Sequence, residues 1–128
     1  MTIELSLLLW AAILTLVLAG VSVLGALQQV GLARLAGNRE SMPEITGWGG
    51  RAQRAHRNML ESLIIFAILV LAAKSLNISN TTTELGAYLF FWGRIGHAVV
   101  YIMGLPWVRT GAWAVSVVGL VLMFLQLI

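Results

Sequence analysis

The stretch that decides the fold reads R-A-Q-R-A-H-R-N-M-L-E-S-L-I-I-F-A-I-L-V-L-A-A, from Arg51 to Ala73. Its second half, from Leu63 to Ala73, is fully apolar, whereas its first half, from Arg51 to Glu61, is crowded with charge. As a helix, this stretch is long enough to cross the hydrocarbon core of a bilayer. Charged side chains inside a membrane persist where they face a bundle interior or a wet cavity. We therefore expect a membrane helix whose charged half has a function.

The composition around this stretch is that of a membrane protein. Hydrophobic residues make up 59% of the 128 residues and charged residues only 10%, against about 25% charged in soluble domains. A water-soluble fold of this size cannot bury so much apolar surface. The formal net charge is +3, but no Lys/Arg run is long enough to indicate nucleic acid as a partner. The chain has no cysteine, which excludes disulfides, thiolate metal sites and a cysteine nucleophile.

Polar, turn-forming segments divide the chain into helices. The loop 37–50 is rich in glycine, the segment 77–84 is polar, and Pro106 breaks the chain. Thr82 or Thr83 is the expected cap of the third helix. We predict an all-α fold, an integral membrane four-helix bundle that forms a single domain over residues 1–128. Its four transmembrane helices are expected at about 4–36, 48–76, 84–104 and 107–127.

Positive charge predicts the orientation in the membrane. Six arginines lie in or beside the first and third loops, at one end of the bundle: Arg34, Arg39, Arg51, Arg54, Arg57 and Arg109. The other end has Lys74 as its only cation, together with Glu4 and Glu84. The positive-inside rule therefore puts the first and third loops in the cytoplasm and both termini outside.

One face of the second helix collects its polar side chains. At about 100° per residue, five of them fall within roughly 120° of arc: Arg51, Arg54, Arg57, Asn58 and Glu61. His56 points elsewhere. The simplest interpretation of Arg51 is an anchor at the lipid headgroups. Asn58 and Glu61 lie deeper on this face. They indicate either a structural ion pair between Glu61 and Arg54, Arg57 or Arg94, or a bound polar ligand.

The third and fourth helices present polar faces at the same end. Arg94, His97 and Tyr101 lie within about 60° of one another on helix three, and we expect them to form a cavity wall. On helix four, Arg109 is either a snorkelling anchor or part of this wall. A lone histidine without Cys, Asp or a second nearby His predicts no metal site. The combined set suits an anionic ligand whose carboxylates are clamped by arginine and whose amine meets Glu61.

Three motifs resemble the MAPEG superfamily, membrane-associated proteins in eicosanoid and glutathione metabolism. They are R-x-x-R-A-H-R-N-x-x-E from Arg51, R-x-x-H-x-x-x-Y from Arg94 and P-x-x-R-T from Pro106. The chain looks most like bacterial members related to microsomal glutathione transferases and microsomal prostaglandin E synthase. The resemblance implies homotrimers of four-helix protomers in the bacterial inner membrane. It also implies that glutathione is bound between protomers, in a site that opens to the cytoplasm.

The resemblance implies roles for individual residues. Those expected to hold the glutathione backbone and its charged ends are Arg54, Arg57, Asn58 and Glu61. Those expected to line the same site are His56, Arg94, His97 and Tyr101. Thr110 stands where a serine occurs in the prostaglandin E synthase branch. Arg109 matches the arginine proposed to stabilise the glutathione thiolate. A cation beside a thiol lowers the pKa of the thiol, and the thiolate is the nucleophile, so Arg109 is the expected catalytic residue.

The chain departs from the family pattern at Gly31, Ile64 and Trp113, where an arginine, a proline and a tyrosine are common. Whether Arg34 or Trp113 contributes to the site is therefore open. We expect a glutathione-dependent transferase or peroxidase that acts on hydrophobic electrophiles or lipid hydroperoxides among the membrane lipids. The alternative is a non-catalytic lipid- or glutathione-binding scaffold of the same family. A transport role is disfavoured, because the apolar half of helix two offers no polar pathway.

Overall fold

The computed structural model describes residues 1–128 and consists of helices joined by short segments, without strands. The helices are α1 (Ile3–Val30), α2 (Leu32–Ala36), α3 (Gly47–Ser75), α4 (Thr81–Met103) and α5 (Pro106–Leu127). All but α2 are long and apolar enough to cross a membrane. The predicted fold class, an all-α membrane protein with four spanning helices, is therefore confirmed.

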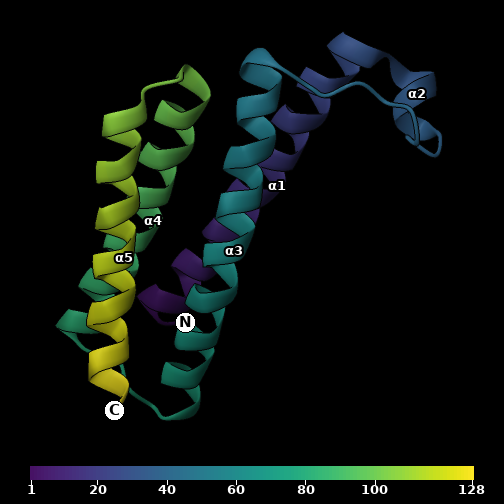
Figure 1. Cartoon of the computed structure of the whole chain (residues 1–128). Helices are drawn as coiled ribbons and strands as arrows, with labels where there is room; N and C mark the ends of the chain where they lie inside the picture. Colours follow the sequence, from purple (N-terminus) through teal and green to yellow (C-terminus); the bar gives the residue numbers. More distant parts are fainter.

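The four long helices form two antiparallel pairs, α1 with α3 and α4 with α5 (Figure 1). Glycines allow the close approach within each pair. A Cβ atom added to Gly86 on α4 would lie only 2.6 Å from the carbonyl oxygen of Gly119 on α5. A Cβ atom added to Gly25 on α1 would lie 2.5 Å from the Cα of Gly49 on α3. Membrane helices pack through such small residues because lipid supplies no hydrophobic force between them.

The two pairs meet through apolar side chains at the centre of the bundle. The rings of Phe66 on α3 and Phe90 on α4 are stacked with their centroids 4.1 Å apart. Met59 and Met123 are also fully buried in this cluster. Large apolar side chains on the outer faces stay exposed, for example Leu16 at 68%. Outward-facing apolar residues of this kind suit a lipid environment.

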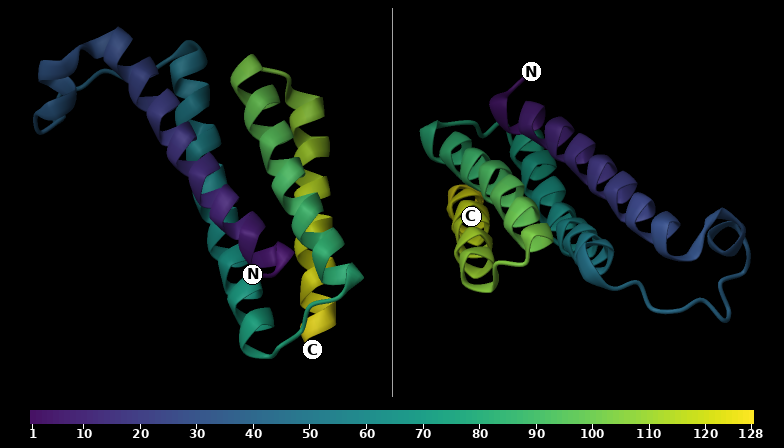
Figure 2. Two further views of the ribbon diagram at one scale, coloured as in Figure 1. Left: turned by 180° about the vertical axis from the view of Figure 1, so that it is seen from behind. Right: turned by 90° about the horizontal axis from the view of Figure 1, so that it is seen from above.

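The first predicted helix is shorter than expected. It ends at Val30, because Gly31 combines a positive φ of 82 with an extended ψ of 163, a conformation that no α-helix continues through. The short α2 follows and leans away from the four long helices, as both views of Figure 2 show. The Gln29 side chain, near the end of α1, binds the residue that precedes α3. Its Nε2 donates to the Thr46 carbonyl (2.7 Å), and the Thr46 N–H donates to its Oε1 (2.9 Å).

Both termini lie at the end of the bundle where α3 leads into α4 (Figure 1). The Thr83 hydroxyl donates to the buried Glu4 carboxylate (3.3 Å), and the Asn80 amide donates to Gln126 (3.1 Å). The predicted start of the third helix is wrong by three residues. Asn80, rather than Thr82 or Thr83, is the N-cap, and its side chain accepts from the backbone N–H groups of both threonines.

The opposite end carries the polar half of α3. There α4 ends at Met103, and Gly104 caps it in the left-handed conformation, with φ 82. The Arg51 Nε donates to the carbonyl of Ile102 (2.8 Å), an acceptor in the last turn of α4. This contact fixes the start of α3 beside the α4–α5 turn. The polar residues of α3 and the first turn of α5 are thereby brought to the same end.

Candidate functional site

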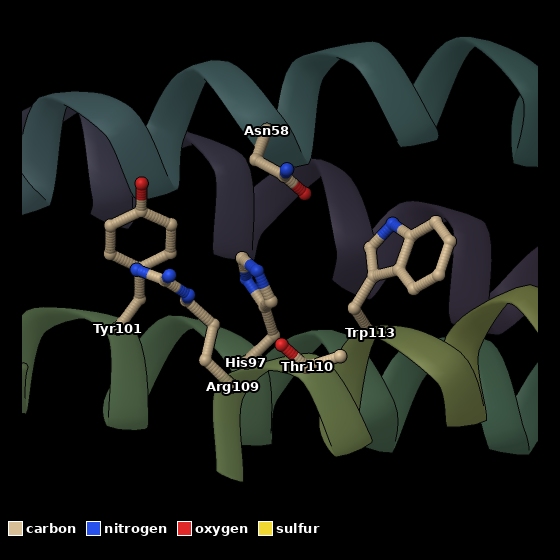
Figure 3. Close-up of a pocket in the computed structure, with 6 residues that line it drawn as sticks. All are labelled: Asn58, His97, Tyr101, Arg109, Thr110 and Trp113. Carbon is tan, nitrogen blue, oxygen red and sulfur yellow. The ribbon is translucent and has the colours of Figure 1, made fainter. Parts of the chain in front are cut away.

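A cavity of about 250 Å³ opens between α3 and the α4–α5 pair at this polar end. Its six lining residues come from three helices: Asn58, His97, Tyr101, Arg109, Thr110 and Trp113. In Figure 3, Asn58 descends from α3 and faces the five side chains that rise from α4 and α5. Five of the six belong to the predicted site. The fold therefore gathers residues that are up to 55 positions apart in the sequence, from Asn58 to Trp113.

Aromatic contacts hold the cationic wall of this cavity in place. The guanidinium carbon of Arg109 lies 4.5 Å from the centroid of the Tyr101 ring, within cation–π range. Tyr101 in turn packs edge-on against His97, with the ring centroids 5.3 Å apart. The Arg54 guanidinium lies farther out, 6.0 Å from the same Tyr101 ring. Arg109 is therefore a fixed part of the cavity wall rather than only a snorkelling anchor.

Arg94 lies behind this wall and does not line the cavity. Its side chain is buried, at 1% exposure. Its Nη2 donates to Asn58 Oδ1 and lies 3.4 Å from His97 Nδ1. The other two nitrogens, Nε and Nη1, are enclosed without a hydrogen-bond partner. The structure therefore gives no support to a structural ion pair between Arg94 and Glu61.

The cavity continues along α3 and α5 as one groove that becomes progressively apolar. The next section, about 200 Å³, shares Asn58 and Trp113 with the first and adds Glu61 and Ser62. The last section, about 310 Å³, is entirely hydrophobic, and its lining residues are Ile65, Leu69, Val117, Leu120, Val121 and Phe124. Glu61 thus lies between a cationic end and an apolar end of the groove.

The sequence of residues 5–128 matches the model of the MAPEG family. The chain belongs to the MAPEG family. No curated protein and no solved structure matches it. The match covers nearly the whole chain, which confirms the resemblance carried by the three motifs. Membership supports, at the level of the family, a membrane function of the glutathione-related transferase or synthase type.

Four of the residues that the resemblance assigns to the glutathione site do not line the groove within one chain. Arg57 is exposed on α3, His56 is half-buried, Arg54 lies outside the cavity, and Arg94 lies beneath it. Arg34, whose role the sequence left open, is exposed on α2, away from the groove. Their assignment to a glutathione site therefore remains a prediction.

Besides the apolar residues of the groove, Trp113 and Ser62 line it without having been assigned to the site from the sequence. Trp113 lines both polar sections, and Ser62 lines the second. Trp113 lies four positions after Arg109, on the same helical face, which is a usable signal. Ser62 follows Glu61 directly and faces the groove only because α5 lies beside α3, so its place depends on packing. No three His, Cys, Asp or Glu side chains lie close enough together to hold a metal ion.

The residues of the groove fit glutathione, which the MAPEG family implies. Its two polar sections together fall within the range of about 300–1,000 Å³ that is typical of ligand sites. Arg109, Asn58 and His97 offer donors for carboxylates and peptide carbonyls. Glu61 offers the only carboxylate of the groove, suited to an amine. This distribution matches a small peptide with two acidic ends and one amino group.

Proposed function

We propose that the protein is a membrane-bound glutathione transferase or peroxidase that acts on hydrophobic electrophiles or lipid hydroperoxides. The observation that carries the proposal is the single groove between α3 and α5. It begins at the Arg109–Tyr101 pair and ends among apolar side chains such as Leu120 and Phe124. A site with this polarity can hold a charged thiol peptide beside the apolar portion of a lipid-soluble molecule.

In this proposal the chain binds and orients glutathione with a small set of residues. Glu61 binds the amine, while Asn58 and His97 donate to carbonyl or carboxylate oxygens. Arg109 would hold the thiol end of glutathione, where its charge would favour the deprotonated form. When bound, glutathione supplies the thiolate nucleophile. Tyr101 contributes by holding the Arg109 guanidinium against its ring, so the cation is already in place before the ligand arrives.

We also propose that the protein acts as a trimer in the bacterial inner membrane, with the polar end of the groove facing the cytoplasm and both termini outside. Clustered arginines at that end support this orientation, and family membership supports a location in the membrane. His56 and Arg57 lie outside the groove of their own chain. In a trimer such residues are available to a glutathione molecule bound between neighbouring protomers.

The test is a conjugation assay with the purified protein, glutathione and an aryl halide. Arg109→Ala is expected to lower kcat by about 10²-fold, the usual effect of removing one electrostatic stabiliser from a transition state. Lys74→Ala removes a cation at the opposite end of the bundle and serves as the matched control. Glutathione should also raise the melting temperature of the wild-type protein.

Two results would contradict the proposal in different ways. If glutathione stabilises the protein but a broad panel of electrophiles and hydroperoxides gives no turnover, the protein is a glutathione-binding scaffold. If glutathione produces no stabilisation at concentrations well above those that saturate related enzymes, the groove binds a different ligand. A lipid that stabilises the protein in its place would then identify a lipid scaffold.

A further inference from the structure

Arg94 is the largest fully buried side chain in the chain, and only one of its three nitrogens is satisfied. Nη2 contacts Asn58 and His97, whereas Nε and Nη1 have no partner. A buried cation with unsatisfied donors costs free energy and contributes little to fold stability. Its contacts, however, go to two residues that line the cavity. The importance of Arg94 therefore lies in its contacts with Asn58 and His97 rather than in the stability of the fold.

An arginine side chain carries only hydrogen-bond donors. The Asn58 atom that faces Arg94 must therefore be the oxygen, which fixes the amide orientation and leaves Nδ2 as the free end. By the same argument, His97 Nδ1 must be an acceptor when it faces Arg94 at 3.4 Å. The neutral ring then carries its proton on Nε2. One buried guanidinium thus determines which atoms of Asn58 and His97 are left free as hydrogen-bond donors.

Both free ends reach the cavity. The only enclosed side-chain N or O atoms that lack a partner belong to Glu4 and Arg94 itself. Asn58 Nδ2 and His97 Nε2 are not among them and make no hydrogen bond within the chain. They therefore face the open space that both residues line. The deep wall of the cavity presents N–H donors at both positions.

We propose that Arg94 is a positioning residue that never touches the ligand. It locks Asn58 and His97 as N–H donors, so that the cavity selects a carbonyl or carboxylate oxygen over a donor group. This inference rests on the proposed function insofar as glutathione, with its carboxylates and peptide carbonyls, is the acceptor-rich ligand. The arrangement of donors itself does not depend on the identity of the ligand.

The first experiment needs no ligand. The chain has only two histidines, so ¹⁵N-histidine labelling with a His56→Gln variant for assignment reports the His97 ring directly by NMR. We expect a single Nε2–H tautomer in the wild-type protein and a mixture of tautomers in Arg94→Met. Arg94→Lys restores one donor and should recover part of the Nε2–H population. Wild-type His97 protonated on Nδ1, or a tautomer ratio unchanged in Arg94→Met, would overturn the proposal.

The second experiment separates an indirect role from direct binding. Arg94→Met should weaken glutathione binding by about tenfold, since a misoriented amide loses a hydrogen bond to a charged group. Combined with Asn58→Ala, the loss should be smaller than the product of the two single losses, because Arg94 acts partly through Asn58. Thr15→Val, which changes a buried hydroxyl on α1 bonded only to its own helix, is the control.

The outcomes distinguish the positioning role of Arg94 from the proposed binding of glutathione. Multiplicative losses in the double variant mean that Arg94 does not act through Asn58, which contradicts its role in positioning that amide. If the wild-type protein fails to bind glutathione while His97 still shows the Arg94-dependent tautomer, the proposed function is wrong. The positioning of Asn58 and His97 by Arg94 is then still confirmed. Should Arg94→Met fail to fold, the tautomer of the wild-type protein and of Arg94→Lys still decides the question.

Discussion

At the scale of single residues, arginines that look equivalent in the sequence have different partners in the structure. Arg51 donates to the backbone of α4, Arg109 lies over Tyr101, and Arg94 is buried behind Asn58. Helical periodicity identifies the face on which each side chain lies. It cannot identify the atom that each guanidinium contacts, because that depends on how neighbouring helices are placed.

Glu61 provides the most direct residue-scale test of the ligand. As the only carboxylate in the groove, it is expected to pair with the amine of glutathione. Glu61→Gln keeps the size of the side chain and removes the charge, so glutathione affinity measured by calorimetry should fall by about tenfold. Glu84→Gln, at the opposite end of the bundle, should leave the affinity unchanged. Equal affinity in wild-type and Glu61→Gln protein would remove Glu61 from the site.

Arg51 should behave differently from the other arginines of its face. Arg51→Met keeps the apolar stem but removes the donor to the Ile102 carbonyl, so the free energy of unfolding should fall by about 1 kcal/mol. A thermal melt in detergent measures this loss. Glutathione affinity should stay within about twofold of wild type, because Arg51 lines neither polar section of the groove. A large loss of affinity without a loss of stability would assign Arg51 to the ligand instead.

At the scale of elements, the sequence predicts most of the helices and misses the details that local backbone geometry decides. The apolar runs and Pro106 are sufficient to predict four membrane-spanning helices. The break at Gly31 was missed because glycine is tolerated inside helices, and only its positive φ shows that the helix stops there. The cap at Asn80 was missed because the threonines after it are also acceptable caps.

The α4–α5 pair depends on the contact between Gly86 and Gly119. A methyl group on Gly86 would meet the Gly119 carbonyl oxygen at 2.6 Å and the Met123 side chain at 2.7 Å. Gly86→Ala should therefore destabilise the protein by about 1–3 kcal/mol, the usual cost of overpacking. Gly20→Ala is the matched control, because nothing lies within 4 Å of its added Cβ. If both variants melt at the wild-type temperature, the two helices do not pack as closely as described.

At the scale of the whole molecule, the groove is a property of the assembled helices rather than of any one of them. The sequence predicts which end of the bundle is polar, since the arginines and the motifs all lie there. It does not predict that the polar cavity continues into an apolar section between α3 and α5. That continuity depends on how far apart the two helical pairs lie. Ile65 on α3 and Val117 on α5 line both the middle and the apolar section.

The apolar section gives the last prediction, which concerns substrate length. From Arg109 to Phe124 the groove follows α5 for about 22 Å at 1.5 Å per residue, long enough for an extended acyl chain. Val117 lines both the middle and the apolar section. Val117→Trp should therefore obstruct a long chain and lower kcat/KM for a fatty-acid hydroperoxide by about tenfold or more, equivalent to about 1.4 kcal/mol. Turnover of a small aryl halide should change less than about twofold.

Val118→Trp is the control for this prediction, because its side chain is on the adjacent, exposed position of the same helix, at 51% exposure. It adds the same bulk toward the lipid and should affect neither substrate. A loss of both activities in Val117→Trp would indicate a packing defect, which a melting curve would reveal. Unchanged activity toward the hydroperoxide would mean that the reacting lipid approaches Arg109 by another route, since a chain lying between α3 and α5 cannot pass an indole at position 117.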